Sequence, residues 1–130
     1  MFEAILTRFE KQCETKENHI DEQLKTHYYK GTFKQLFEQV EKLLAQDGKY
    51  IVDHISQEHG EISVKIKNGK TFFLIITLVA VRPYEVAVDL HISTESFSVF
   101  GSYPMLKNEI DTFYQKLNKV GSLIGTGRSI

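Results

Sequence analysis

The sequence predicts an α+β fold in which an antiparallel meander sheet of about five strands is packed against helices. Apolar residues recur at helical spacing near both ends of the chain and over residues 33–44, and they alternate with a period of two over residues 50–94. The 130 residues are 42% hydrophobic and 25% charged, which is typical of one ordinary globular domain. We expect an N-terminal helix and linker over residues 1–23, an α+β core over 24–120 and a flexible tail over 121–130.

Charge and cysteine content narrow the class of protein. The 16 basic and 17 acidic residues give a net charge of −1, so the basic surface that nucleic acids require is missing. Cys13 is the sole cysteine, which rules out an intramolecular disulfide. The first residues lack a secretory signal, and the longest apolar stretch, residues 72–81, is about half the length of a membrane-spanning helix. The sequence therefore predicts a cytoplasmic protein without a membrane segment.

The N-terminal segment has the spacing of an amphipathic helix over residues 2–16. Its apolar stripe consists of Phe2, Ile5, Leu6, Phe9 and Cys13. The polar run 15–23 is typical of a linker. A short strand is predicted over residues 24–29, where side chains alternate between the two faces.

The second helix has the clearest local signal. Thr32 and Gln35 have the spacing of a capping box, in which each side chain bonds a free backbone N–H of the first turn. Six apolar residues then share one face, namely Phe33, Leu36, Phe37, Val40, Leu43 and Leu44. Asp47 and Gly48 follow, and a glycine there suits a left-handed helix stop. These signals predict a helix over residues 32–46.

Two turns predict the strand register. Asn68-Gly69 favours a two-residue hairpin turn, which pairs Lys67 with Lys70. A second turn centred on Arg82-Pro83 extends the meander, although proline is disfavoured at the second central position, which leaves a longer loop as the alternative. Both turns place the same apolar residues on a core face: Ile62, Val64, Ile66, Phe73, Ile75, Val79, Val86, Val88, Leu90 and Ile92.

The last helix is predicted to begin after Pro104 and to end before Gly121. Its apolar stripe comprises Leu106, Ile110, Phe113, Leu117 and Val120. The glycine-rich tail over residues 121–130 matches neither the phosphate-loop nor the dinucleotide spacing, and we expect it to fray.

The predicted order of helix, strand, helix, four strands and helix resembles TATA-binding-protein-like and helix-grip folds. Residues 24–30 (LKTHYYK) and 81–84 (VRPY), taken with the overall pattern, are also similar to a family of small uncharacterised cytosolic bacterial proteins. That resemblance implies a single cytosolic domain, and it supplies no activity, cofactor or site residue.

The predicted register leaves a second apolar surface on the sheet face opposite the core. This surface consists of Phe72, Leu74, Ile76 and Leu78, with Ala80 beside them. A contiguous exposed apolar patch of this size marks an interface. Three occupants fit it: the N-terminal helix of the same chain, which base rates for layered domains favour, a second copy of the chain, or a ligand in a groove.

Candidate binding residues follow from position, because the sequence contains no catalytic, metal or cofactor motif. Asp53 and His54 lie on a strand whose turn length decides which of the two points toward the core, although an edge strand more commonly turns such a polar residue to the rim. Asp89 and His91 lie two apart on one strand face, as an acid-base pair does. The candidate binding residues are Asp53, His54, Arg82, Tyr84, Asp89 and His91.

The leading functional hypothesis is a non-enzymatic cytosolic binding or protein-interaction module that forms a homodimer through the apolar outer face of its sheet. The alternative is a small-molecule-binding protein or small enzyme with a cavity between sheet and helices, near Asp53, His54 and Tyr114. Single-stranded nucleic acid is a third possible partner, and Glu61, Glu85 and Asp89 on the sheet argue against it.

Overall fold

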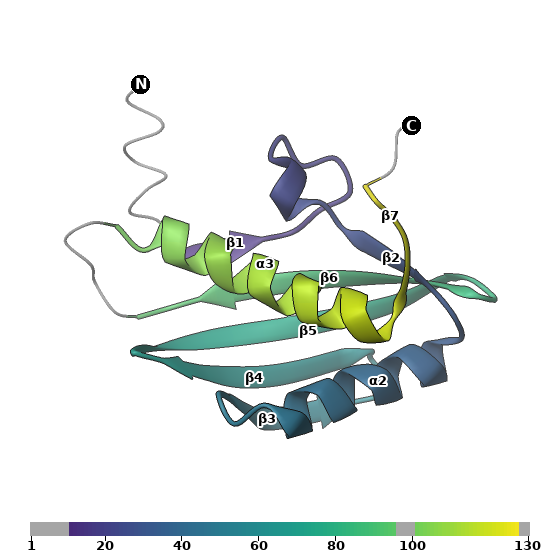
Figure 1. The fold of residues 1–130 in the computed structure, drawn as a ribbon, viewed down its shortest axis with the longest axis horizontal. Helices are drawn as coiled ribbons and strands as arrows, with labels where there is room; N and C mark the ends of the chain where they lie inside the picture. Colours follow the sequence, from purple (N-terminus) through teal and green to yellow (C-terminus); the bar gives the residue numbers. More distant parts are fainter. Residues whose placement is uncertain (1–10, 96–100, 128–130) are drawn as a thin grey trace.

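The structure is a computed structural model, and it describes residues 11–95 and 101–127. In these residues it confirms the α+β class, with two α-helices and an open antiparallel sheet of seven strands rather than about five (Figure 1). The elements are β1 (Gln12–Glu14), the 3₁₀ helix η1 (Glu22–Leu24), β2 (His27–Lys30), α2 (Phe33–Gln46), β3 (Tyr50–Ser56), β4 (Glu61–Asn68), β5 (Lys70–Arg82), β6 (Glu85–Ser93), α3 (Tyr103–Val120) and β7 (Ser122–Thr126).

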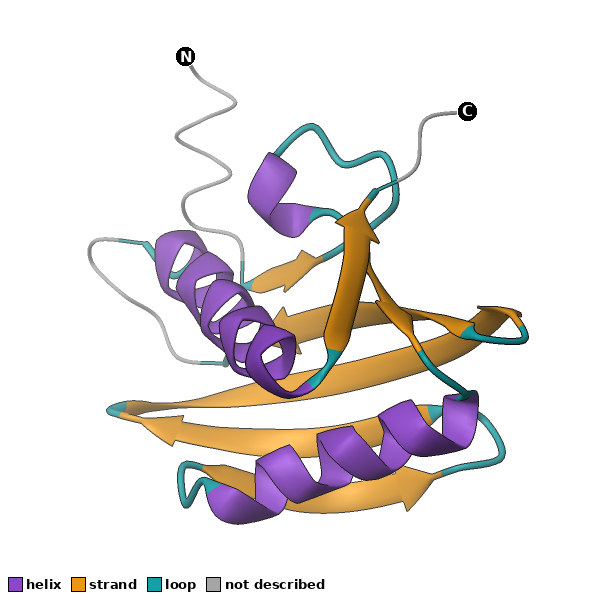
Figure 2. Cartoon of the chain, turned by 45° about the vertical axis from the view of Figure 1, so that its right-hand side comes forward, coloured by secondary structure: helices purple, strands orange, loops and turns teal. Residues whose placement is uncertain are grey.

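The sheet combines a local meander with strands from both ends of the chain. Its order is β3-β4-β5-β6-β2-β7, and β1 also pairs with β6. One edge of β6 therefore has two partners: β2 lies beside residues 85–88 and β1 lies beside residues 91–93. Helix α2 carries the chain from β2 to β3 at the opposite edge of the sheet, and both helices pack on one face of it (Figure 2).

Helix α2 begins as its sequence predicts. Thr32 Oγ1 accepts a hydrogen bond from the Gln35 backbone N–H at 3.2 Å, and Gln35 Oε1 accepts one from the Thr32 backbone N–H at 3.0 Å. This confirms the capping box. The helix ends at the predicted residue, Gln46, but without the predicted left-handed glycine. Gly48 does not have a positive φ, and Asp47 has an extended backbone with φ −117°. The Asp47 carboxylate instead accepts the Lys49 backbone N–H at 3.1 Å.

Helix α3 and α2 bury their apolar stripes in one core. Pro104 lies in the first turn of α3, as predicted, and Gly121 follows its last residue. The predicted stripe residues Leu106, Ile110, Phe113 and Leu117 are fully buried. They form a single cluster with the α2 stripe and with the inward residues of β4, β5 and β6.

The register of the β4–β5 hairpin differs from the prediction by one residue. Asn68 pairs with Lys70, so Gly69 alone forms the tip of the turn, with φ +76°. Lys67 consequently lies opposite Thr71, and Val64 lies opposite Leu74. Because side chains alternate along a strand, this single-residue slip turns every β5 side chain to the other face.

The β5–β6 turn slips in the same direction. Arg82 pairs with Glu85, so the loop is Pro83-Tyr84, and an irregularity lies between Ala80 and Arg82. Proline now occupies the first central position of the turn, which its fixed φ favours. The two slips leave β4 and β6 in their predicted orientation and invert only β5.

The inversion overturns the prediction that Phe72, Leu74, Ile76 and Leu78 form an interface on the outer face. These four side chains are at most 2% exposed and lie in the core under the helices. The outer face instead presents the alternate side chains Phe73, Ile75, Thr77 and Val79, and Val81, which lies in the irregularity after Ala80, is also exposed.

Two terminal predictions are also corrected. Residues 12–14 of the predicted first helix form strand β1, which pairs with β6 through Cys13 opposite Ile92. Residues 2–10 of that helix, and its proposed packing on the sheet, lie outside the described residues. The tail predicted to fray forms β7, which pairs with β2. Edge pairing of such short segments depends on the rest of the sheet and leaves little local signal.

Candidate functional site

The outer face of the sheet, which is the face turned away from α2 and α3, presents a line of partly exposed apolar side chains along β5. The exposed fractions are 36% for Phe73, 39% for Ile75, 51% for Val79 and 42% for Val81. Isolated exposed apolar residues are common, but four along one strand, with Thr77 among them, form a stripe of the kind that marks an interaction surface.

Charged side chains flank this stripe in a regular order set by the register. Three rows cross the outer face, each with one residue from β4, β5 and β6: Lys65-Phe73-Ser93, Ser63-Ile75-His91 and Glu61-Thr77-Asp89. The row with Lys65 is basic and the row with Glu61 and Asp89 is acidic. The row through Ile75 lies midway between them.

A hollow of about 330 Å³ lies beside Ile75 on this face. Its lining includes Ile75, Thr77, Glu14, Glu61, Asp89 and His91. The predicted candidates Asp89 and His91 therefore line the same hollow. Ile75 and Leu90 contribute its apolar lining, and Glu14, Glu61 and Asp89 contribute carboxylates from three strands. Among the described residues, no group of three or more His, Cys, Asp or Glu side chains is arranged to hold a metal ion.

Asp89 is held in place where β6 passes from one edge partner to the other. Its Oδ1 accepts hydrogen bonds from Thr15 Oγ1 at 2.7 Å and from Thr26 Oγ1 at 2.5 Å. Thr15 Oγ1 also accepts the Leu90 backbone N–H at 2.9 Å. Both threonines are almost fully buried. Asp89 thus joins three segments of the chain, which assigns it a structural role in shaping the hollow.

A buried aromatic and polar cluster lies on the helix side of the same junction. Tyr114 donates to the Val88 carbonyl at 2.6 Å, and the His27 ring stacks on Tyr114 with centroids 3.5 Å apart. The Tyr29 hydroxyl donates its proton to Asn118 Oδ1 at 2.6 Å. The same hydroxyl oxygen lies 3.1 Å from His27 Nδ1 and therefore acts as the acceptor in that hydrogen bond. Burial lowers the pKa of His27 to about 4, against the opposing effects of Asn118 and Asp111.

The remaining predicted binding residues are scattered over the surface. Asp53 and His54 are both exposed on the edge strand β3, so neither faces the core, and the expected alternative of an edge strand with its polar residues at the rim holds. A register irregularity between Val52 and His54 and the edge position keep both in solvent. Arg82 and Tyr84 lie at the β5–β6 turn, where Tyr84 is 69% exposed and Arg82 Nε is 3.9 Å from Glu85 Oε2.

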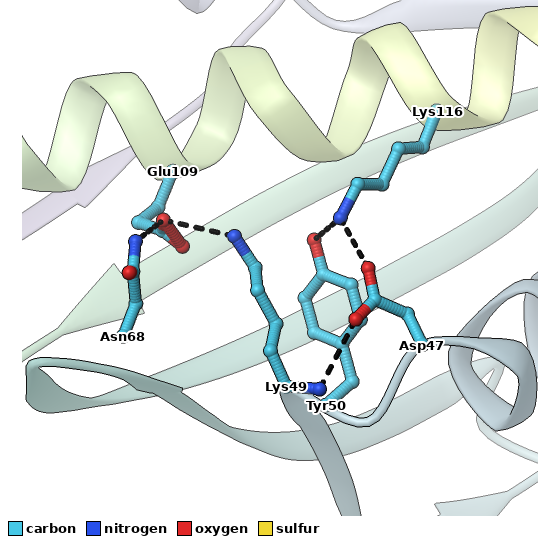
Figure 3. A network of polar contacts seen from close by, with 6 residues as sticks. All are labelled: Asp47, Lys49, Tyr50, Asn68, Glu109 and Lys116. Carbon is cyan, nitrogen blue, oxygen red and sulfur yellow. Dashed lines mark hydrogen bonds and ion pairs between the residues drawn. The ribbon is translucent and has the colours of Figure 1, made fainter.

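A second cavity, here named the α3 pocket, lies between α3 and the β4–β5 hairpin. Its volume is about 290 Å³, and its lining residues are Asn68, Phe72, Pro104, Met105, Asn108 and Glu109. Glu109 is 3% exposed, and its Oε1 accepts hydrogen bonds from Lys49 Nζ at 3.2 Å and from Asn68 Nδ2 at 3.0 Å (Figure 3). Its Oε2 is buried and accepts no hydrogen bond from residues 11–95 or 101–127.

A neighbouring ion pair holds α3 against the start of β3. Lys116 Nζ lies 2.5 Å from Asp47 Oδ2 and 3.5 Å from the Tyr50 hydroxyl (Figure 3). The hydrogen bond from Lys116 is the main cause that lowers the pKa of Asp47. Glu109 and Lys116 of α3 therefore both bind groups near the α2–β3 connection, which fixes the helix over this side of the sheet.

The sequence contained one signal for the α3 pocket that its analysis missed. Glu109 lies three residues after Leu106 and four before Phe113, so it shares the apolar stripe of α3. A charged residue within such a stripe indicates a buried carboxylate with specific partners. Those partners, Lys49 and Asn68, are distant in sequence and have no local signal.

No protein-family model matches the chain, and no curated protein matches it. In the parts of the chain that the structure describes, no helix is long and apolar enough to span a membrane. The fold of residues 11–95 and 101–127 defines the class: α+β, with an open antiparallel sheet of seven described strands that two described helices cover on one face. Bacterial origin, cytoplasmic location and the likeness to TATA-binding-protein-like or helix-grip folds stay predictions.

Proposed function

We propose that this protein is a non-enzymatic interaction module that forms a homodimer by stacking the outer faces of two sheets. The observation that supports the proposal most strongly is the stripe Phe73, Ile75, Val79 and Val81, whose exposed fractions range from 36% to 51%. Two sheets that pack face to face bury such a stripe in a shared core.

The order of charges on the outer face favours one dimer geometry. A two-fold axis along the row through Ile75 places each strand over its own copy in the opposite direction. Lys65 then faces Glu61 of the second copy, because the two residues lie symmetrically on either side of Ser63. Phe73 faces Thr77 of the second copy, so its ring enters the hollow that Thr77 lines. Opposite charges and opposite shapes therefore meet at these two positions, whereas Glu14, which pairs with His91 on the row of the axis, faces its own copy.

A two-fold axis along the strands gives a less favourable contact. It places β4 over β6 of the second copy, so Glu61 faces Asp89, its neighbour in the acidic row. Like charges that face each other in an interface weaken association. The contacts of Lys65 and Glu61 thus favour the antiparallel stacking about Ile75.

The first test is sedimentation velocity of the full chain over concentrations up to the high micromolar range. We expect a concentration-dependent dimer, and Ile75→Glu should abolish it because the axis brings two carboxylates together. Ile20→Glu is the matched control, since Ile20 is 98% exposed and lies in the loop between β1 and η1. A wild-type protein that stays monomeric throughout the series contradicts the proposal.

The second test is a charge exchange. Lys65→Glu and Glu61→Lys each replace two attractions by two repulsions in a symmetric dimer, and each should weaken association by about tenfold. The double variant restores opposite charges and should recover wild-type association. Equal weakening in the double variant would reject the antiparallel geometry.

A further inference from the structure

The α3 pocket contains a carboxylate with one oxygen bonded and the other without a donor in the described residues. Glu109 Oε1 has two donors, Lys49 and Asn68, whereas Oε2 is buried and receives none from residues 11–95 or 101–127. A buried acceptor without a donor is unfavourable, and such groups are few in native proteins because a water molecule, an ion or a ligand usually satisfies them. Glu109 also lines the cavity of about 290 Å³ at the start of α3. The cavity therefore places a ligand beside this carboxylate, and because Oε2 itself is buried, a donor in the cavity reaches it through a small shift of the Glu109 side chain.

The charge of Glu109 is already balanced. Lys49 Nζ lies 3.2 Å from Oε1, and its side chain is only 22% exposed. A cationic ligand would add an uncompensated positive charge beside Lys49, and an anionic ligand would be repelled by Oε2. An uncharged hydroxyl or amide N–H group supplies the missing donor without changing the balance.

The other lining residues define the body of the ligand. Phe72, Pro104 and Met105 provide apolar walls, and the volume of about 290 Å³ lies at the small end of ligand cavities. We propose that the α3 pocket binds a small uncharged molecule with an apolar body and one hydroxyl or amide N–H, which donates to Glu109 Oε2. This inference is independent of the proposed dimer, because the pocket lies on the helix-covered side of the sheet.

The test uses one-ring probes that differ in a single group. Benzyl alcohol and benzamide carry a neutral donor, anisole carries an acceptor alone, and benzylammonium and benzoate carry charges. Titrations of the full chain are followed by NMR through the side-chain amide signals of Asn68 and Asn108. We expect the two neutral donors to bind about tenfold more tightly than anisole, and both ions to bind more weakly than the neutral donors. Equal affinities for benzyl alcohol and anisole, or no shift of either amide signal, would overturn the proposal.

Variants separate the carboxylate from the cavity. Glu109→Gln can keep an oxygen toward Lys49 and Asn68 while it places an amide N–H₂ at the position of Oε2, so the preference should shift from benzyl alcohol toward anisole. Met105→Trp should reduce binding of all five probes by filling the cavity. Glu38→Gln, an exposed change on α2, should leave every affinity unchanged. An unchanged preference in folded Glu109→Gln protein counts against the proposal, and if that variant does not fold, the wild-type probe series decides.

Discussion

Protonation of His27 provides a quantitative test of the buried cluster between α3 and the sheet. Its side chain stacks on Tyr114 and is 8% exposed, and burial lowers its pKa from 6.5 to about 4. The folded protein therefore holds the neutral imidazole, while the unfolded chain takes up a proton as soon as the pH falls below about 6.5. The resulting stabilisation is fully present above pH 6.5 and is lost as the pH falls through about 4.

The size of the effect follows from the two pKa values. The interval from 6.5 to about 4 corresponds to at most about 3.5 kcal/mol of unfolding free energy, at about 1.4 kcal/mol for each pH unit. At pH 5 the expected loss relative to neutral pH is about 2 kcal/mol. The carboxylates with lowered pKa, Asp21 and Asp47, lose their stabilisation only below their usual value of 3.8, so their effect falls at lower pH.

The assay is urea unfolding of the wild type and of His27→Gln at a series of pH values from neutral to 4. The variant has no imidazole ring at position 27 to titrate. Between pH 6.5 and 4 its free energy of unfolding should therefore fall by about 2 to 3 kcal/mol less than that of the wild type. The difference in slope is the test, because the substitution also changes packing against Tyr114. Parallel pH profiles for the two proteins would refute a buried neutral His27.

Four substitutions test other features of the fold by urea or thermal unfolding. Leu74→Ala should lower the free energy of unfolding by about 2 to 5 kcal/mol, because the Leu74 side chain is buried. Ile75→Ala should lower it by under about 1.5 kcal/mol, because Ile75 lies on the outer face. A larger loss for Ile75→Ala than for Leu74→Ala would show that the register is wrong. Thr32→Ala removes the α2 cap and should cost about 1 kcal/mol, and a neutral result would show that the capping box contributes little. Gly60→Ala should lower the free energy of unfolding by more than about 2 kcal/mol, because Gly60 has φ +68° and an added Cβ would lie 2.3 Å from the Leu78 carbonyl oxygen. Unchanged stability of this variant would contradict the close approach of the two strands at Gly60.

Elements with a complete local signal could be predicted from the sequence. Helix α2 has a capping pair, a continuous apolar stripe and a polar end, and all three act within the helix itself. The start of α3 at Pro104 is likewise local. Strands β1 and β7 could not be predicted, because three or five residues acquire strand structure only by pairing with β6 and β2.

The orientation of β5 was the error with the largest effect on the candidate site. Phe72, Leu74 and Ile76 are as apolar as Phe73 and Ile75, so alternation along the strand cannot choose between its faces. The two turns slip in the same direction, and the predicted register was therefore as self-consistent as the observed one. Only the backbone conformations around Gly69 and Pro83 distinguish the two arrangements.

The candidate residues show the same division between local and distant information. Asp89 and His91 were placed correctly on one strand face because β6 alternates cleanly, and they line one hollow. The bonding of Asp89 to Thr15 and Thr26 depends on segments more than sixty residues away in sequence. Periodicity contains no information about such contacts.

The two apolar faces of β5 have a consequence for sequence change in this protein. A one-residue insertion at the turn on one end of β5, near Gly69 or Pro83, combined with a one-residue deletion at the turn on the other end would exchange the two faces of the strand. Apolar β5 side chains would still lie beside the core residues of β4 and β6. Length variation at two turns, without substitution inside the strand, is thus a route by which descendants of this chain could acquire a different binding surface while retaining a packed interior.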